Sequence, residues 1–413
     1  MNEEFERRSK AVFEKLRILS RITPDIVFLG GSAIQALLKT PKRLSIDLDI
    51  AYSGDVQKLI KELEKEGCEV KQRKSRAPDF TFYNISKNGI LVKLDIIKIS
   101  IPETEKHTIR DFQVFTPNPS YFLASKLSAL ALDTIGRLEE EPQQILKDIF
   151  DINCILDLQP DLGQFQKNWR QIISDQNKLR KTRFTEHECL FSAQKTLLKC
   201  IDAAPLPEFF ISPHALGSFQ DMLIDGKISR KVIAVMAARA LALSTNTTRQ
   251  FYEIEKSVLE EAKSASKLEE ASKALIKRNY ASAKQITAIK TVAPVALMFL
   301  IHHAQRISSM EGAWIKAAVE HTVLEIEYYS AKTKHELTKR KVNPDFIGPD
   351  RRGRNNGFWT TFDHLRNEGP RCFKPETILR WSATAERFEP SKDGRWKELL
   401  IKYAQLGLEF KSF

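Results

Sequence analysis

The stretch from residue 26 to residue 50 constrains the fold of this chain more than any other. It reads IVFLGGSAIQALLKTPKRLSIDLDI. A short apolar run of β-formers precedes Gly30-Gly31-Ser32 and an amphipathic segment follows at 33–38, so the pattern predicts a strand, a turn and a helix. Glycines let a ligand approach the backbone, and the free N–H groups that open a helix favour phosphate. We therefore predict a phosphate site at this turn, with the Ser32 hydroxyl as a further donor.

Two aspartates follow the turn in a segment where apolar and acidic residues alternate. Residues 46–50 read IDLDI, and on a strand this alternation directs Asp47 and Asp49 to the same face. Adjacent carboxylates repel each other unless a positive charge lies between them, and Mg²⁺ or Mn²⁺ takes oxygen ligands of this kind. The pattern therefore predicts a divalent metal site. A solvated sheet face with two surface acids would have the same pattern.

The order of these residues resembles the signature of the nucleotidyltransferase superfamily that includes DNA polymerase beta. In that signature a glycine-serine turn, a short helix, a basic residue, a serine and two acids follow one another, as they do here. The resemblance implies that Gly30, Gly31, Ser32, Arg43 and Ser45 take part in binding a nucleoside triphosphate. It also implies that the two acids hold metal ions.

The same signature implies a third acid on a neighbouring strand, and the chain has one at Asp95. Residues 80–86 and 90–99 are rich in β-formers and are separated by Lys87-Asn88-Gly89, which is typical of a hairpin turn. Three acids holding two metal ions would stabilise the attacking and leaving oxygens of a displacement at phosphorus. Asp95 would also accept the proton of the attacking hydroxyl. A single charge at a sheet edge is the alternative explanation.

The composition indicates a folded, helix-rich globular protein with room for two domains. The chain has 413 residues, of which 42% are hydrophobic. Its five cysteines are widely spaced and lack a zinc-ligand pattern, which indicates reduced thiols. The first residues are too charged for a signal peptide, and the longest apolar run, 292–301, is about half of what a membrane span needs. We therefore expect a cytoplasmic protein without membrane contact.

The net charge of +12 is unevenly distributed along the chain. Residues 1–160 contain 24 Lys and Arg and 24 Asp and Glu, a balance of zero, whereas residues 331–413 contain 18 and 11, a balance of +7. A neutral first part joined to a basic remainder suggests that the remainder binds a polyanion such as RNA. Ordinary solubility charge explains the same distribution equally well.

Two helices are expected after the first sheet. Residues 119–137 and 142–158 each carry an apolar stripe at helical spacing. Lys126 lies beside the stripe of the first helix, and Asp148 and Asp151 lie together on the flank of the second, with Lys147 four residues before Asp151. A surface lysine that extends its ammonium into water, and an ion pair within one helix, would explain these residues without any catalytic role.

A narrower resemblance rests on five segments in this order, GGSAI, KRLSIDLDI, VKLDII, SKLSAL and KDIFDI. They resemble the AbiEii/AbiGii toxin family of nucleotidyltransferases over residues 24–158, a family that includes mycobacterial toxins that modify transfer RNA. The resemblance implies that Lys126 and Asp148 belong to the active site and that Lys126 contacts the triphosphate. It also implies transfer of a nucleoside monophosphate to RNA, in particular to the 3′ acceptor end of transfer RNA, and a cognate antitoxin protein.

The second half of the chain resembles nothing that we recognise. Lysines and alanines at 262–290 leave open whether these helices face solvent or RNA, and a basic, glycine-rich loop at 348–357 precedes two aromatic residues. Basic and aromatic residues in and after this loop predict contacts with the phosphates and stacked bases of RNA: Arg351, Arg352, Arg354 and Trp359. A plain basic surface loop is equally consistent with the sequence. Helical periodicity dominates 185–200, 229–243, 247–262, 267–278 and 314–333.

We therefore expect an α+β protein with an N-terminal nucleotidyltransferase fold, a small mixed sheet flanked by helices, followed by a mainly α-helical C-terminal part. Residues 1–182 would form the catalytic domain with a helical extension, and residues 183–413 a helical, basic domain. Two alternatives stay open. One is nucleotidyl transfer to a protein hydroxyl or a small molecule. The other is a non-catalytic RNA-binding or partner-binding module on the same fold, against which the retention of all three acids and Lys126 argues.

Overall fold

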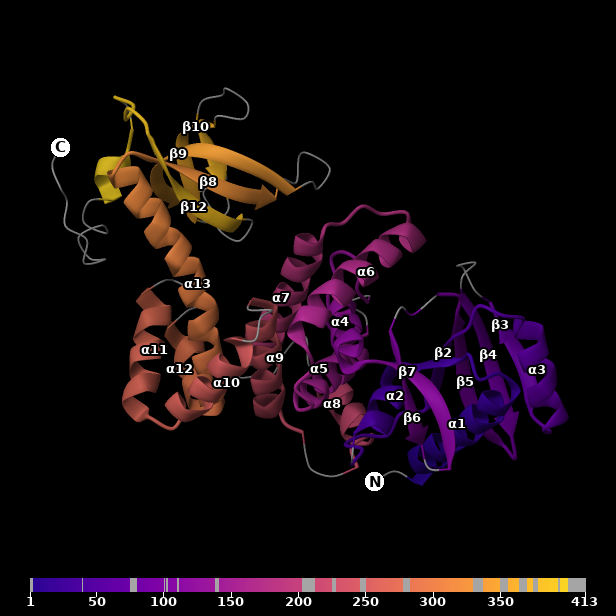
Figure 1. Cartoon of the computed structure of the whole chain (residues 1–413). Coiled ribbons are helices and arrows are strands. Elements are labelled where there is room, and N and C mark those ends of the chain that lie inside the picture. The colour runs from indigo at the N-terminus through magenta and orange to yellow at the C-terminus, as the bar shows by residue number, and fades with distance from the viewer. Residues whose placement is uncertain are drawn as a thin grey trace.

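The computed structural model contains two β-sheets at opposite ends of a helical middle (Figure 1). It describes residues 3–38, 40–74, 80–99, 101, 103–109, 111–137, 141–202, 212–224, 228–245, 250–277, 283–329, 337–349, 356–363, 370–373, 378–392 and 394–399. Among these residues, no helix has both the length and the apolar character that crossing a membrane requires.

The first sheet has seven strands in the order β3-β4-β5-β2-β1-β7-β6. Pairing is parallel between β2 and β5 and between β1 and β7, and antiparallel elsewhere, so the sheet is mixed as predicted. The Asn88-Gly89 hairpin turn between β4 and β5 is confirmed, with both residues at positive φ. The strands are β1 (Val27–Leu29), β2 (Asp47–Ala51), β3 (Glu69–Arg73), β4 (Phe80–Lys87), β5 (Ile90–Ile97), β6 (Thr104–Ile109) and β7 (Phe112–Pro117).

Two helices cover one face of this sheet. They are α1 (Glu3–Ile22) and α3 (Val56–Lys65), and both pack against each other and against the strands. Along β5 the side chains alternate between buried and exposed positions, because every second residue faces these helices. The short helix α2 (Gly30–Leu37) instead follows β1 directly and lies against α4 and α5.

A bundle of helices follows the sheet (Figure 1). Helix α4 was expected to reach residue 137 but ends at Ala129, because the chain turns tightly there and Gly136 lies against the backbone of Ala131. The helices α6, α7 and α9 pack on α4 and α5, and α8 packs on α5. The bundle consists of α4 (Pro119–Ala129), α5 (Pro142–Leu156), α6 (Leu162–Arg180), α7 (Glu186–Asp202), α8 (Pro213–Gln220) and α9 (Arg230–Thr245).

Four further helices lead to the second sheet, which was not expected. Residues 314–333 were predicted to be helical, but α13 ends at Val319 and a strand begins at Thr322. The helices are α10 (Gln250–Glu261), α11 (Ala265–Lys277), α12 (Ala283–Val292) and α13 (Pro294–Val319). The sheet, in the order β11-β10-β9-β8-β12, consists of β8 (Thr322–Tyr329), β9 (Leu337–Pro349), β10 (Asn356–Asp363), β11 (Arg371–Phe373) and β12 (Ile378–Arg387), and the 3₁₀ helix η2 (Trp396–Leu399) follows it.

Candidate functional site

The turn between β1 and α2 leaves no room for side chains. Gly30 has a φ of 70°, and a Cβ atom there would overlap the Asp49 carboxylate. A Cβ atom on Gly31 would overlap the guanidinium of Arg43 and lie 3.2 Å from the hydroxyl of Ser45. The two glycines therefore allow the start of α2 to approach the acidic strand β2 and the basic residue that precedes it.

Ser32 is buried, and its hydroxyl donates a hydrogen bond to the backbone oxygen of Asp47 at 2.6 Å. This bond fixes α2 against β2. Donation from the Ser32 hydroxyl to a phosphate would require the hydroxyl to leave this backbone oxygen. This role of Ser32 stays a prediction.

The three predicted acids lie on adjacent parallel strands. Asp49 on β2 pairs in register with Asp95 on β5, and Asp47 lies two residues before Asp49 on the same face. Burial, followed by the charges of Asp95 and Asp47, raises the pKa of Asp49 to about 7. Burial also raises the pKa of Asp95, although Arg73 opposes this effect. The acids therefore repel one another, and a cation between them would relieve the repulsion.

The donor set fits a hard divalent cation, although the ligands do not already converge. One carboxylate oxygen of Asp47 is buried and has no hydrogen-bond partner among the described residues. In the part of the chain that the structure describes, no three His, Cys, Asp or Glu side chains lie close enough together to hold a metal ion. Carboxylate oxygens are nevertheless the ligands that Mg²⁺ and Mn²⁺ prefer.

Basic side chains and two further acids form a buried network beside the turn. The Lys126 ammonium lies 2.8 Å from Asp148 and 3.0 Å from Asp151, so Lys126 is not a surface lysine with its ammonium in water. The Arg43 guanidinium donates to both oxygens of Asp151, at 2.8 and 2.7 Å, and Arg137 donates to Asp148 at 2.6 Å. Both acids are completely buried. We call Arg43, Lys126, Arg137, Asp148 and Asp151 the ion-pair network.

The network keeps the Asp151 carboxylate ionised. Burial alone would raise the pKa of Asp151, but the charges of Arg43 and Lys126 outweigh burial and lower that pKa. Arg137 and Asp151 were not predicted to belong to the site. The spacing of Asp148 and Asp151 in KDIFDI was the available signal for Asp151, whereas nothing in the sequence connected Arg137 to either acid.

Lys147 and Arg73 also border the site and were not predicted. Burial, together with the charges of Arg43 and Lys126, lowers the pKa of Lys147 to about 8. The expected pairing of Lys147 with Asp151 is replaced by the contacts of Asp151 with Arg43 and Lys126. The guanidinium of Arg73, at the end of β3, forms an ion pair with Asp95.

The segment that carries Arg43 is fastened to the helical bundle. Leu44 donates its backbone N–H to the backbone oxygen of Met222 at 2.7 Å. Lys42 forms an ion pair of 2.7 Å with Asp157, the C-cap residue of α5. Gln35 of α2 accepts from the backbone N–H groups of Lys42 and Arg43 at 2.8 and 3.1 Å. Residues after α8 therefore help to hold the basic residue in place.

Trp359, the predicted RNA-binding residue that the structure describes, does not join this site. Arg351, Arg352 and Arg354 lie outside the described residues. Trp359 lies on β10 and stacks on Phe346, with ring centroids 5.6 Å apart and ring planes 2° from parallel. Figure 1 shows β10 and β2 at opposite ends of the molecule. RNA binding by Arg351, Arg352, Arg354 and Trp359 stays a prediction.

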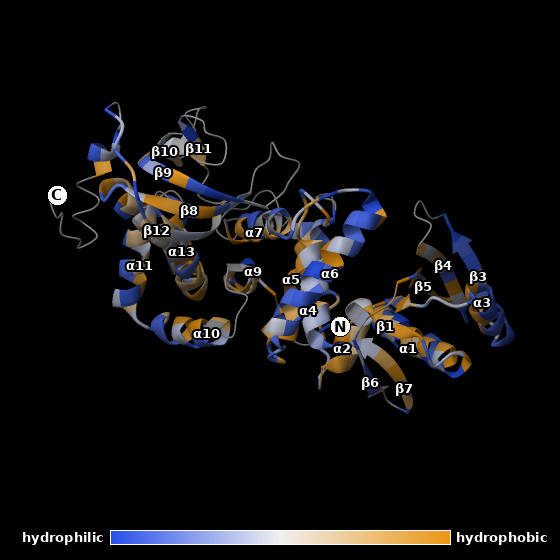
Figure 2. Ribbon diagram, turned by 45° about the horizontal axis from the view of Figure 1, so that its top comes forward, coloured by the Kyte–Doolittle hydropathy of each residue, from blue (hydrophilic) through white to orange (hydrophobic). Residues whose placement is uncertain are grey.

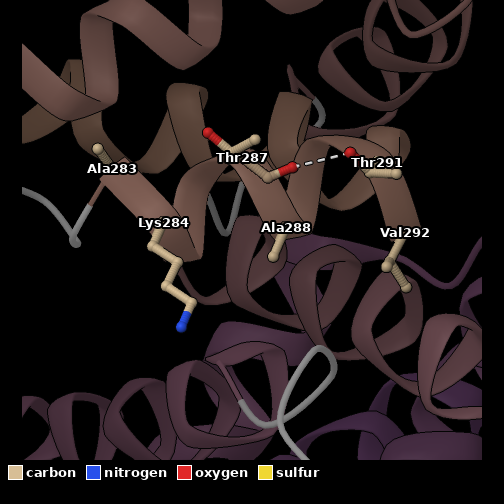
Figure 3. A pocket seen from close by; sticks show the side chains of 6 residues that line it. All are labelled: Ala283, Lys284, Thr287, Ala288, Thr291 and Val292. Carbon is tan, nitrogen blue, oxygen red and sulfur yellow. Dashed lines mark hydrogen bonds between the residues drawn. The ribbon is translucent and has the colours of Figure 1, made fainter.

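A pocket lies along α12 (Figure 3). A hydrogen bond from the Thr291 hydroxyl to the backbone oxygen of Thr287, 3.0 Å long, lies within one turn of this helix. The pocket contains none of the predicted site residues. It is lined by Ala283, Lys284, Thr287, Ala288, Thr291 and Val292.

Comparison with known protein families identifies the class of the protein. Residues 16–225 match the family described as the nucleotidyl transferase AbiEii toxin of a type IV toxin-antitoxin system. The match spans 210 of the 413 residues, just over half of the chain. The protein is therefore a nucleotidyltransferase. It belongs to the AbiEii toxin family, which confirms the resemblance found in the sequence.

The solved structures that are similar to this chain include two from different organisms. The first is JHP933 from Helicobacter pylori, with 12% sequence identity, a TM-score of 0.36, and coverage of 63% of this chain and 98% of that chain. The second is an antigenic nucleotidyltransferase-like protein from Paracoccidioides brasiliensis, with 16% identity, a TM-score of 0.28, and coverage of 49% and 89%. A comparison with characterised proteins gave no match.

Proposed function

We propose that this enzyme transfers a nucleoside monophosphate from a nucleoside triphosphate to the 3′ end of an RNA, in particular of transfer RNA. The observation that carries the proposal is the row of acids beside the glycine turn. Asp49 and Asp95 lie in register on parallel strands, and burial, followed by the charges of Asp95 and Asp47, raises the pKa of Asp49 to about 7. Repulsion between neighbouring carboxylates destabilises the folded protein, and bound cations, together with phosphates, would relieve it. Strongly shifted pKa values of this kind are typical of functional sites.

The triphosphate would lie between the glycine turn and the ion-pair network. The start of α2 has no side-chain cap, so its free N–H groups are available to phosphate oxygens. Arg43, Lys126 and Arg137 are held in fixed positions by Asp148 and Asp151. Glu141 also pairs with Arg137, at 3.9 Å, but it is exposed, so the three cations outnumber the two buried acids. The surplus positive charge would stabilise the charge that develops on the leaving pyrophosphate.

In the reaction, the oxygen of the RNA 3′ hydroxyl forms a bond to the α-phosphorus, and the bond from that phosphorus to the oxygen of the leaving pyrophosphate breaks. Asp95 accepts the proton of the attacking hydroxyl, because burial raises its pKa and makes it a stronger base than a surface aspartate. When bound at Asp47, Asp49 and Asp95, Mg²⁺ or Mn²⁺ would stabilise the attacking and leaving oxygens.

The remaining parts of the proposal concern the partners. The surplus positive charge beyond residue 160 favours an RNA acceptor. We assign residues 1–182 to the catalytic domain and residues 183–413 to a basic domain that holds the RNA through Arg351, Arg352, Arg354 and Trp359. The five cysteines are free, which suits the reducing cytoplasm in which transfer RNA is found. The family description also implies an antitoxin partner.

The proposal is tested by incubating the purified protein with total RNA, Mg²⁺ and each labelled nucleoside triphosphate in turn, followed by a denaturing gel. We expect label on RNA of transfer-RNA size, and we expect Asp49→Ala or a chelator of divalent cations to abolish it. Asp111→Ala is the matched control, because Asp111 is exposed and pairs only with Arg17 among the described residues. Label on protein alone would replace RNA by a protein hydroxyl as acceptor, and absence of all label would contradict transferase activity on either.

A further inference from the structure

One face of strands β3, β4 and β5 carries aromatic and basic side chains next to the acids. The opposite face is buried under α1 and α3. Because neighbouring residues of a strand point to opposite faces, the exposed face presents every second residue. On β4 these are the half-buried Phe80, Phe82 and Asn84, and on β5 they include the exposed Lys93 and the half-buried Asp95.

The strand register aligns these side chains in a row that ends at the acids. Arg73 on β3 pairs with Phe82 on β4, Phe82 pairs with Asp95 on β5, and Asp95 pairs with Asp49 on β2. Side chains at paired positions lie on the same face and in contact distance. The outermost strand, β3, is mostly hydrophilic (Figure 2). The row therefore leads from a polar sheet edge across an aromatic ring to the catalytic candidates.

Arg73, Phe80 and Phe82 form one contact group, which we call the aromatic platform. The two rings are stacked, with centroids 6.0 Å apart and planes 27° from parallel, and the guanidinium carbon of Arg73 lies 5.2 Å from the centre of the Phe82 ring. Arg73 also pairs with Asp95. The Nε atom of Arg73 is buried and has no hydrogen-bond partner among the described residues. Guanidinium groups carry five N–H donors, so Arg73 retains donors for a ligand.

We propose that the aromatic platform binds the terminal nucleotide of the acceptor RNA. The base would stack on Phe80 and Phe82, and Arg73 would contact the phosphate or ribose of the same nucleotide, with Lys93 supplying positive charge beside it. Unpaired bases that stack on aromatic side chains of a sheet, next to basic residues, are the usual form of single-stranded RNA recognition. This inference rests on the proposed function, because it assigns the acceptor of the same reaction.

The order of residues across the sheet assigns the platform to the acceptor and not to the donor. Asp49 lies directly against Gly30, on the side of the glycine turn and the ion-pair network. Asp95 lies on the other side of Asp49, and Phe82 and Arg73 lie beyond Asp95. A triphosphate bound at the glycine turn therefore places its base and ribose away from the platform or between the acids. A hydroxyl that gives its proton to Asp95 approaches from the side of the platform.

The test uses a short single-stranded oligoribonucleotide whose last base is 2-aminopurine, a fluorescent base whose emission falls when it stacks. The full-length protein is titrated into this probe without nucleoside triphosphate. We expect a saturable decrease in emission, and we expect Phe82→Leu to weaken binding about tenfold or more, since loss of one base-stacking ring has an effect of that size. Phe82→Tyr should restore binding, because tyrosine keeps the ring.

The matched control is Phe112→Leu, which alters a half-buried phenylalanine of the same sheet on β7, away from the platform. Equal binding by the wild type and Phe82→Leu, or no change in emission with the wild type, would overturn the inference. Displacement of the probe from the wild type by a nucleoside triphosphate that fails to bind Phe82→Leu would assign the platform to the donor nucleotide. That result would also overturn the inference.

The transferase assay separates this inference from the proposed function. If the protein labels RNA and Phe82→Leu leaves the KM for RNA unchanged, the platform assignment is wrong and the proposed function stands. If Phe82→Leu raises the KM for RNA and leaves the KM for the nucleoside triphosphate unchanged, both stand. If the platform binds the probe but no RNA is labelled, RNA binding stands and RNA is not the acceptor.

Discussion

At the scale of single residues, the contact between Gly30 and Asp49 explains why the site tolerates so little change. A residue with φ near 70° already favours glycine, and the Asp49 carboxylate occupies the space that any Cβ atom would need. The same close approach removes water from Asp49, which is the main cause of its raised pKa. The geometry that prepares the site for a ligand therefore also destabilises the empty protein.

The raised pKa of Asp49 predicts how stability depends on pH. The folded protein holds a proton on Asp49 up to about pH 7, whereas an unfolded chain releases it near pH 4. The folded state therefore binds more protons between these values, and stability falls as pH rises through that window. Asp49→Asn removes this loss, so we expect it to increase the free energy of unfolding at pH 8 by on the order of 2 kcal/mol and to leave it nearly unchanged at pH 4.

Urea unfolding of the two proteins at both pH values in the absence of divalent cations measures this effect. Asp111→Asn serves as control, since Asp111 is exposed. An Asp49→Asn variant with the same pH dependence as the wild type would show that Asp49 is not buried among like charges.

At the scale of elements, local signals predicted the start of the chain well. Alternation in 46–50 identified β2 and the face of its acids, and Asn88-Gly89 identified the β4–β5 hairpin. Apolar periodicity located α5, α7, α9, α10 and α11. The strand β8 was missed because TVLEIEYY directly continues the periodic apolar pattern of α13, and a short apolar run does not by itself distinguish helix from strand.

The ion-pair network was harder to predict because its members come from four separate segments. Arg43 precedes β2, Lys126 lies on α4, Arg137 follows α4, and Asp148 and Asp151 lie on α5. Packing of α4 on α5, and of α2 on both, brings these segments together. Family resemblance supplied Lys126 and Asp148, whereas their partners required the structure.

Breaking this network should destabilise the fold as well as the site. Asp151→Asn removes the negative charge that faces the buried Arg43 and Lys126, and loss of one partner of a buried pair costs about 3–5 kcal/mol. Glu186→Gln is the control, because Glu186 and Arg170 form an exposed pair between α6 and α7 whose loss should cost less than about 1 kcal/mol. Chemical denaturation of both variants compares them, and similar small changes would contradict the buried network.

At the scale of the whole molecule, the surplus positive charge is not spread evenly over the helices. Four lysines of the segment at 262–290 pair with nearby acids: Lys263 with Glu260, Lys267 with Glu270, and both Lys273 and Lys290 with Glu269. These pairs favour the solvated interpretation of that segment over an RNA-facing one. The basic residues of 331–413 therefore remain the principal candidates for RNA phosphates.

This division of charge predicts two different salt dependences. Replacing Arg351, Arg352 and Arg354 by Gln should weaken RNA binding and reduce the slope of log affinity against log salt by about 2, because each lost contact with a single strand changes the slope by about 0.7. Replacing Lys263, Lys267 and Lys273 by Gln removes the same net charge, but these lysines already pair with acids, so the slope should change little. Filter binding of labelled transfer RNA across a range of salt concentrations measures both. Equal slopes for the two variants would mean that RNA binding responds to net charge alone, and that Arg351, Arg352 and Arg354 have no specific part in it.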